Sequence, residues 1–93
     1  MNKVNGMVRR RIVFTGLVQG VGFRWRARHA ASLYGCTGWC RNEGDGSVTM
    51  EIQGDAEQID QVIGAIRGGR YIDIERMDIQ NIPLEDEDSF TTD

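Results

Sequence analysis

The sequence predicts an α+β domain whose helices and strands follow one another in the order β-α-β-β-α-β. Two observations predict the helices, because apolar residues recur at spacings of three and four over residues 23–34 and again over residues 56–66. A third observation predicts strands, because apolar and polar side chains alternate over residues 47–53. This pattern indicates helices packed against a sheet, rather than a helical bundle or an all-strand sandwich.

The predicted elements of the first half are a strand (residues 8–15), a helix (23–34) and the two strands of a hairpin (37–42 and 47–53). The first strand contains an apolar run at residues 12–14 and leads directly into a glycine-rich loop. Gly35 has the place and type of a helix C-cap. Residues 43–46 contain Asp-Gly, a strong signal for a hairpin turn.

The predicted elements of the second half are a helix (56–66), a strand (72–82) and a short edge strand (90–92). Asp55 is placed to cap the helix, and a glycine pair at residues 68–69 ends it. The alternation of the following strand breaks near Met77, which predicts a bulge. The acidic residues 84–88 are expected to form a solvated loop.

This order of elements is that of a ferredoxin-like split βαβ sandwich, an antiparallel sheet of four to five strands with two helices on one face. A chain of 93 residues suffices for one domain. We assign residues 8–93 to that domain, after a flexible N-terminal tail over residues 1–7. Many unrelated functions use this fold, so the function has to be argued from a site.

Charge and composition exclude several classes of partner. The formal net charge of −3 argues against a nucleic-acid backbone as the main partner. No apolar run approaches the roughly 20 residues that span a bilayer, and the first residues lack the apolar core of a signal peptide. We therefore expect no membrane association and a cytoplasmic location. The sequence contains no long apolar run that would indicate a surface for an obligate partner. We therefore expect a monomer.

The two cysteines and the arginine cluster are expected to be structural. Cys36 and Cys40 do not form a C-x-x-C motif, and two cysteines are too few for a disulfide scaffold. We expect both thiols to be reduced and to serve packing. Three arginines at residues 9–11 are interpreted as a solvated strand end, with steering of an anionic substrate as the alternative.

The loop between the first strand and the first helix is a candidate anion site. Gly20 and Gly22 free the backbone from ordinary steric limits, so that successive amides can point inward. The helix that begins at Phe23 adds unsatisfied N–H groups and the positive end of its dipole. Arg24 adds a planar cation that suits an oxyanion. The alternative is a tight turn with an exposed arginine.

Asn42 is the second candidate residue, at the end of the strand that precedes the hairpin turn. Its amide can bind its own turn, which is the common structural role. It can also hold a water or a substrate oxygen without adding charge. In the split βαβ arrangement, we expect Asn42 to lie close to the glycine loop.

Two stretches of the chain resemble the signatures of the acylphosphatase family. They are G-L-V-Q-G-V-G-F-R, residues 16–24, and G-W-C-R-N-E-G-D-G-S-V-T-M-E-I-Q-G, residues 38–54. Two long motifs in the right order are far more specific than a single glycine loop. The chain departs from the family pattern at its C-terminal end, which is short and acidic and leaves a fifth strand in doubt.

The resemblance implies hydrolysis of the carboxyl–phosphate bond of acyl phosphates, without a metal or an organic cofactor. It implies that Arg24 binds the phosphate together with the loop amides, and that Asn42 positions the attacking water. The residues implied in phosphate binding are Gln19, Gly20, Val21, Gly22, Phe23 and Arg24.

Neither motif core contains an expected general base, since Glu43 and Asp45 are predicted turn residues and His29 is predicted on the outer helical face. Because an acyl phosphate has a good leaving group, positioning and charge stabilisation can carry most of the catalysis. We hypothesise that a phosphate oxygen takes the proton of the water.

Two alternatives to an acyl phosphate hydrolase are a non-catalytic anion-binding or regulatory module and an RNA-binding domain. The second needs exposed strand aromatics and a basic face, which residues 47–53 and the net charge do not supply.

Overall fold

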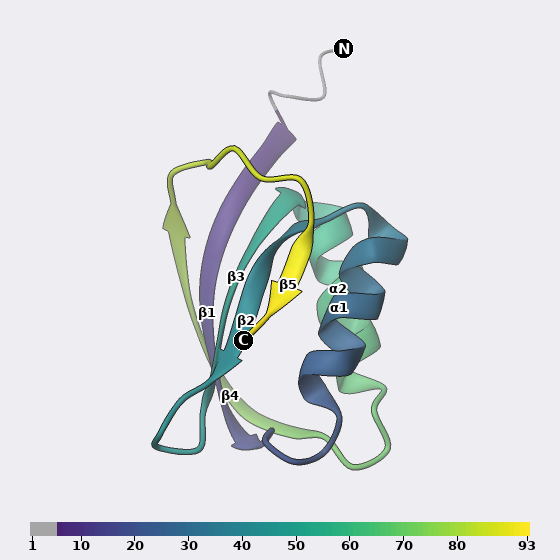
Figure 1. The fold of residues 1–93 in the computed structure, drawn as a ribbon, viewed down its shortest axis with the longest axis vertical. Coiled ribbons are helices and arrows are strands. Elements are labelled where there is room, and N and C mark those ends of the chain that lie inside the picture. The colour runs from purple at the N-terminus through teal and green to yellow at the C-terminus, as the bar shows by residue number, and fades with distance from the viewer. Residues whose placement is uncertain (1–5) are drawn as a thin grey trace.

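Two helices cover one face of a five-stranded sheet in the computed structural model, which describes residues 6–93 (Figure 1). The elements are β1 (Met7–Leu17), α1 (Phe23–Tyr34), β2 (Thr37–Asn42), β3 (Val48–Asp55), α2 (Ala56–Arg67), β4 (Asp73–Ile82) and β5 (Phe90–Thr92). The strands lie side by side in the order β4-β1-β3-β2-β5. All neighbouring pairs are antiparallel except β2 and β5, which are parallel. The predicted ferredoxin-like arrangement is confirmed.

The structure revises several predicted bounds, and β3, for example, covers Val48–Asp55 rather than residues 47–53. β1 begins at Met7 and runs to Leu17, two residues further than predicted. The bulge in β4 lies at Glu75, because Thr15 pairs with Arg76 while Gly16 pairs with Ile74. The fifth strand forms. Of the predicted tail over residues 1–7, residues 1–5 lie outside the described residues, whereas Met7 is the first residue of β1.

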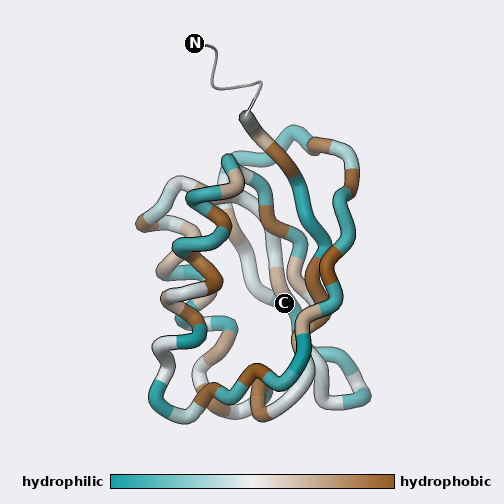
Figure 2. The backbone as a smooth tube through the Cα atoms, turned by 180° about the vertical axis from the view of Figure 1, so that it is seen from behind, coloured by the Kyte–Doolittle hydropathy of each residue, from teal (hydrophilic) through white to brown (hydrophobic). Residues whose placement is uncertain are grey.

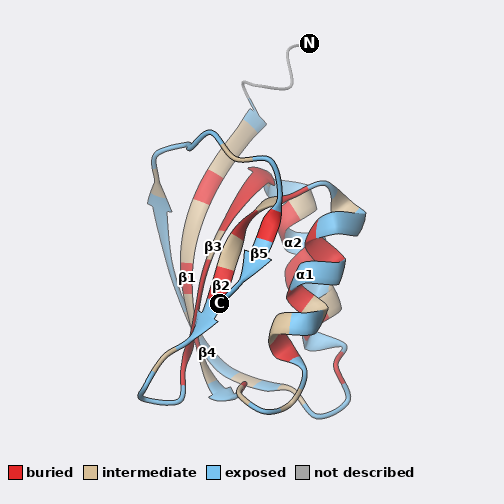
Figure 3. Cartoon of the chain, in the orientation of Figure 1, coloured by how far each residue is buried: buried red, intermediate tan, exposed pale blue. Residues whose placement is uncertain are grey.

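The core lies between the sheet and the two helices (Figure 3). Its sheet side is formed by alternating residues of β1 and β3, namely Ile12, Phe14, Val48, Met50 and Ile52. Both helices show hydrophilic and hydrophobic residues alternating along their turns, as amphipathic helices do (Figure 2). Neither helix in residues 6–93 is long and apolar enough to cross a membrane.

An aromatic pair fixes the start of α1 to the sheet. The rings of Phe14 in β1 and Phe23 in α1 meet edge to face, with their centroids 4.8 Å apart. Both side chains are buried, and burying a phenylalanine stabilises a fold by about 2–3 kcal/mol. The backbone at Arg24, the residue that follows Phe23, is therefore fixed relative to the sheet.

Both cysteines are free and buried, as predicted. Burial raises the pKa of Cys36 to about 11, and the charge of Asp55 adds to that rise. Burial also raises the pKa of Cys40 to about 12, while the nearby Arg24 guanidinium opposes the rise. Both thiols are protonated at neutral pH, and a protonated thiol is a poor nucleophile.

The expectation of a solvated arginine cluster is wrong for Arg9, which is only 1% exposed. Its guanidinium donates to Glu51 of β3 at 3.0 Å and to Glu87 at 2.7 Å. Burial acts to lower the pKa of Arg9, but the hydrogen bonds to Glu87 and Glu51 outweigh it and the pKa is raised. The acidic segment 84–88 is therefore not simply a solvated loop, because it folds over the sheet face opposite the helices and covers Arg9.

Replacing Arg9 with methionine is expected to lower the free energy of unfolding by about 3 kcal/mol, because Glu51 and Glu87 lose their buried counter-charge. Urea unfolding at neutral pH measures this loss. Arg10→Met is the matched control, because Arg10 meets an exposed Asp60 at 3.9 Å and its loss should cost less than about 0.5 kcal/mol. Equal losses in the two variants would contradict a special role for the buried cluster.

Candidate functional site

The glycine loop between β1 and α1 has the backbone geometry of an anion cradle. Gly20 and Gly22 adopt left-handed φ angles of 73° and 83°, whereas the intervening Val21 does not. Such alternation turns neighbouring N–H groups towards one side. Gly22 is the N-cap of α1 and no side chain caps the helix, so its first N–H groups can bind a ligand.

The conformation of this loop, rather than crowding, requires the two glycines. A Cβ atom placed on Gly20 or Gly22 would meet no atom within 4 Å. A left-handed conformation costs other residues about 1–2 kcal/mol each. Alanine at either position is accommodated sterically, but it disfavours the conformation that turns the amides inward.

A cavity of about 190 Å³ brings the loop, the start of α1 and the end of β2 together. It is lined by Val18, Gly20, Gly22, Phe23, Arg24, Trp25 and Asn42. Asn42 pairs with Val48, and both lie on the sheet face that the helices cover. The expected proximity of Asn42 to the glycine loop is therefore present. Gln19 and Val21 contribute loop backbone but are not among the lining residues.

The side chain of Gln19 ties the loop to the hairpin turn. Its Nε2 atom donates to the main-chain oxygens of Glu43 at 2.7 Å and Ser47 at 2.9 Å. These bonds hold the β2–β3 turn, and with it Asn42, against the loop. Sequence reasoning assigned Gln19 to phosphate binding alone and missed this contact, because the partner carbonyls lie 24 and 28 residues away.

Arg24 is held at the mouth of the cavity by the residue that follows β5. Its Nη1 atom donates to the main-chain oxygen of Asp93, and the Asp93 N–H donates to the carbonyl oxygen of Cys40 at 3.0 Å. Asp93, which directly follows the C-terminal strand that the sequence left in doubt, therefore contacts the site and orients the guanidinium.

The titratable groups near Asn42 are poorly suited to act as a general base. Hydrogen bonds from Thr49 and Arg41 lower the pKa of Glu43. Hydrogen bonds from the side chain and backbone of Ser47 lower the pKa of Asp45. His29 is exposed, on the outer face of α1 as predicted, and its Nδ1 lies 2.9 Å from the carbonyl oxygen of Trp25. None of the three lines the cavity.

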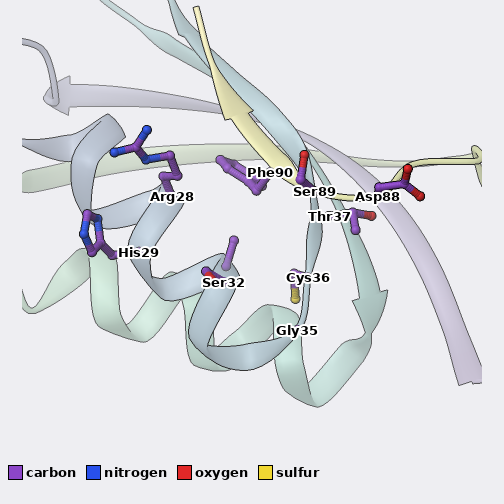
Figure 4. A pocket seen from close by; sticks show the side chains of 10 residues that line it. Arg28, His29, Ser32, Gly35, Cys36, Thr37, Asp88, Ser89 and Phe90 are labelled. Carbon is purple, nitrogen blue, oxygen red and sulfur yellow. The ribbon is translucent and has the colours of Figure 1, made fainter.

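A second cavity of about 490 Å³ lies between α1 and the segment that contains β5 (Figure 4). Its lining includes Arg28, Cys36 and Phe90, but neither Arg24 nor Asn42. The Cys36 thiol there is protonated at neutral pH, because its pKa is raised to about 11. This larger cavity therefore lacks the groups that the two motifs supply.

A loop whose alternating backbone conformation favours inward amides, a guanidinium and an uncharged side-chain amide meet at one small cavity. These groups suit a phosphoryl group and a water molecule. On a ferredoxin-like sheet, this combination is that of a small domain able to bind a phosphoryl group beside a water molecule.

Comparison with known proteins specifies the family. The family model described as Acylphosphatase matches residues 10–92. The chain is 38% identical to an acylphosphatase of Bifidobacterium longum over 88 residues, which cover 94% of this chain and 91% of the relative. The chain therefore belongs to the acylphosphatase family, and its reaction is the hydrolysis of acyl phosphates; a non-catalytic module is not favoured.

Two solved structures share the fold over nearly their whole length. The acylphosphatase of Bacillus subtilis has a TM-score of 0.84 and 26% identity, with 91% of this chain and 97% of that chain covered. The acylphosphatase of Coxiella burnetii has a TM-score of 0.88 and 24% identity, with 100% and 99% covered.

Proposed function

We propose that the loop amides of residues 19–23 and the Arg24 guanidinium bind the phosphoryl group of an acyl phosphate, and that Asn42 positions the attacking water. The observation that carries this assignment is the single small cavity lined by Gly20, Gly22, Arg24 and Asn42. Two motifs far apart in the sequence contribute to one space large enough for a phosphoryl group and a water.

The proposed reaction is one displacement at phosphorus. The water oxygen forms a bond to phosphorus while the bond from phosphorus to the carboxyl oxygen breaks, and the carboxylate leaves with the electron pair. The amides and Arg24 stabilise the charge that spreads over the remaining phosphoryl oxygens. The side-chain oxygen of Asn42 accepts a hydrogen bond from the water and directs its lone pair towards phosphorus.

The proton of the water passes to a phosphoryl oxygen of the substrate in this proposal. The lowered pKa values of Glu43 and Asp45 make both carboxylates weak bases at neutral pH. A carboxylate is a good leaving group that needs no protonation, so a general acid is also dispensable. Positioning and electrostatic stabilisation then account for the rate.

We also propose that residues 8–93 act as a monomeric cytoplasmic domain without a nucleic-acid partner. The net charge of −3 supports the last point. The substrate is a small acyl phosphate, in agreement with the small volume of the cavity.

Benzoyl phosphate tests this function directly. The purified protein in EDTA is expected to release benzoate and inorganic phosphate in equal amounts, with competitive inhibition by added inorganic phosphate. Phosphate binding without turnover would contradict the proposed function and support a binding module. Turnover that disappears in EDTA and returns with a divalent cation would contradict the metal-free mechanism.

A further inference from the structure

Trp25 is an exposed aromatic side chain at the mouth of the proposed phosphate site. It follows Arg24 directly and lines the same cavity, yet its residue surface is 60% exposed. An indole ring is among the largest apolar surfaces a protein can offer a ligand. None of the steps proposed above uses it.

The indole ring is held in place by the next turn of α1. The ring centroids of Trp25 and His29 lie 3.9 Å apart with an interplanar angle of 27°, so the imidazole stacks on the indole. The His29 ring is itself anchored, because its Nδ1 lies 2.9 Å from the carbonyl oxygen of Trp25. A ring that is already ordered loses little conformational entropy when a ligand packs on it.

The lining of the cavity leaves one apolar surface for the part of the substrate that carries no phosphate. Gly20 and Gly22 have no side chain, while Val18 and Phe23 are buried at 1% and 2% exposure. Arg24 and Asn42 are polar and are committed to the phosphoryl group and the water. Trp25 is the remaining lining residue, and it is both apolar and accessible.

We propose that the free surface of the Trp25 indole binds the acyl group, and that it gives this enzyme a preference for acyl phosphates with flat apolar or aromatic acyl groups. This inference rests on the proposed function, because it needs the phosphoryl group in the cradle. A bound phosphoryl group anchors one end of the substrate and leaves the acyl group to extend from the loop to the adjacent rim, where Trp25 stands. An acetyl group is too small to cover an indole ring, so it gains little there.

The test compares kcat/KM for benzoyl phosphate and acetyl phosphate in the wild type, Trp25→Ala and Trp25→Phe. The free energy of an aromatic contact of this kind corresponds to about a tenfold change in kcat/KM. We expect Trp25→Ala to lower kcat/KM for benzoyl phosphate about tenfold and to leave that for acetyl phosphate nearly unchanged, while Trp25→Phe keeps most of the preference. Leu33→Ala is the matched control, because Leu33 is 76% exposed on the same helix and lines neither the proposed site nor the cavity beside β5.

The outcomes separate this inference from the function on which it rests. An unchanged ratio of the two kcat/KM values in Trp25→Ala would overturn the acyl-binding role while leaving acyl phosphate hydrolysis intact. A parallel fall for both substrates, together with weaker inhibition by inorganic phosphate, would show that Trp25 shapes the cradle and would also overturn it. Failure of the wild type to hydrolyse either substrate would overturn the proposed function itself.

Discussion

Replacing Arg24 with lysine is expected to lower kcat/KM for benzoyl phosphate by about 10³-fold, the size of effect that a guanidinium on a transferring phosphoryl group can have. Lysine keeps the charge but lacks the planar fork that donates two parallel hydrogen bonds to an oxyanion. It also cannot reproduce the planar group whose Nη1 donates to the main-chain oxygen of Asp93 in a residue that lines the cavity.

Steady-state kinetics with benzoyl phosphate measure this loss. Arg28→Lys is the matched control, because Arg28 lies one turn later on α1 and lines only the cavity beside β5. That variant should keep the kcat/KM of the wild type. Activity close to wild type in Arg24→Lys would mean that the charge alone suffices, and the assignment of the fork would be wrong.

Replacing Asn42 with alanine is expected to lower kcat by about 10²-fold or more with little change in KM, since the loss of one well-placed polar group in a transition state has an effect of that size. The variant keeps the loop, the amides and Arg24, so the substrate should still bind. It removes the group that we propose orients the water, so the water is no longer held in its attack position.

The control for Asn42→Ala is Asn81→Ala, which removes an exposed asparagine from β4 on the far side of β1 and β3. This control should retain the wild-type kcat. A rise in KM with an unchanged kcat in Asn42→Ala would show that Asn42 binds the substrate rather than positioning the water.

Local sequence patterns predict the elements of this fold well. The helix α1 begins at Phe23 and ends at Tyr34 as its apolar spacing and Gly35 predict. The left-handed conformations of Gly20 and Gly22 are also local properties, because they depend on the missing Cβ. The strand order of this fold then places the end of β2, and with it Asn42, near the loop, so this proximity can be predicted from the fold alone.

Contacts between distant segments are what the sequence could not predict. The acidic residues after β4 resemble a solvated loop, yet Glu87 binds Arg9 across 78 positions of the chain. The Gln19 bonds to the hairpin turn and the bond from Arg24 to Asp93 likewise join segments through folded geometry. Each contact has at least one partner on an irregular segment, where no periodicity signals the contact.

Arg24 and the loop are proposed to bind phosphate, whereas Asn42 is proposed to act on the water. Calorimetric titration of inorganic phosphate into the wild type, Arg24→Lys and Asn42→Ala tests this division most directly. The wild type and Asn42→Ala are predicted to bind phosphate with similar affinity, and Arg24→Lys is predicted to bind it far more weakly. Wild-type affinity in Arg24→Lys, or lost binding in Asn42→Ala, would contradict the account.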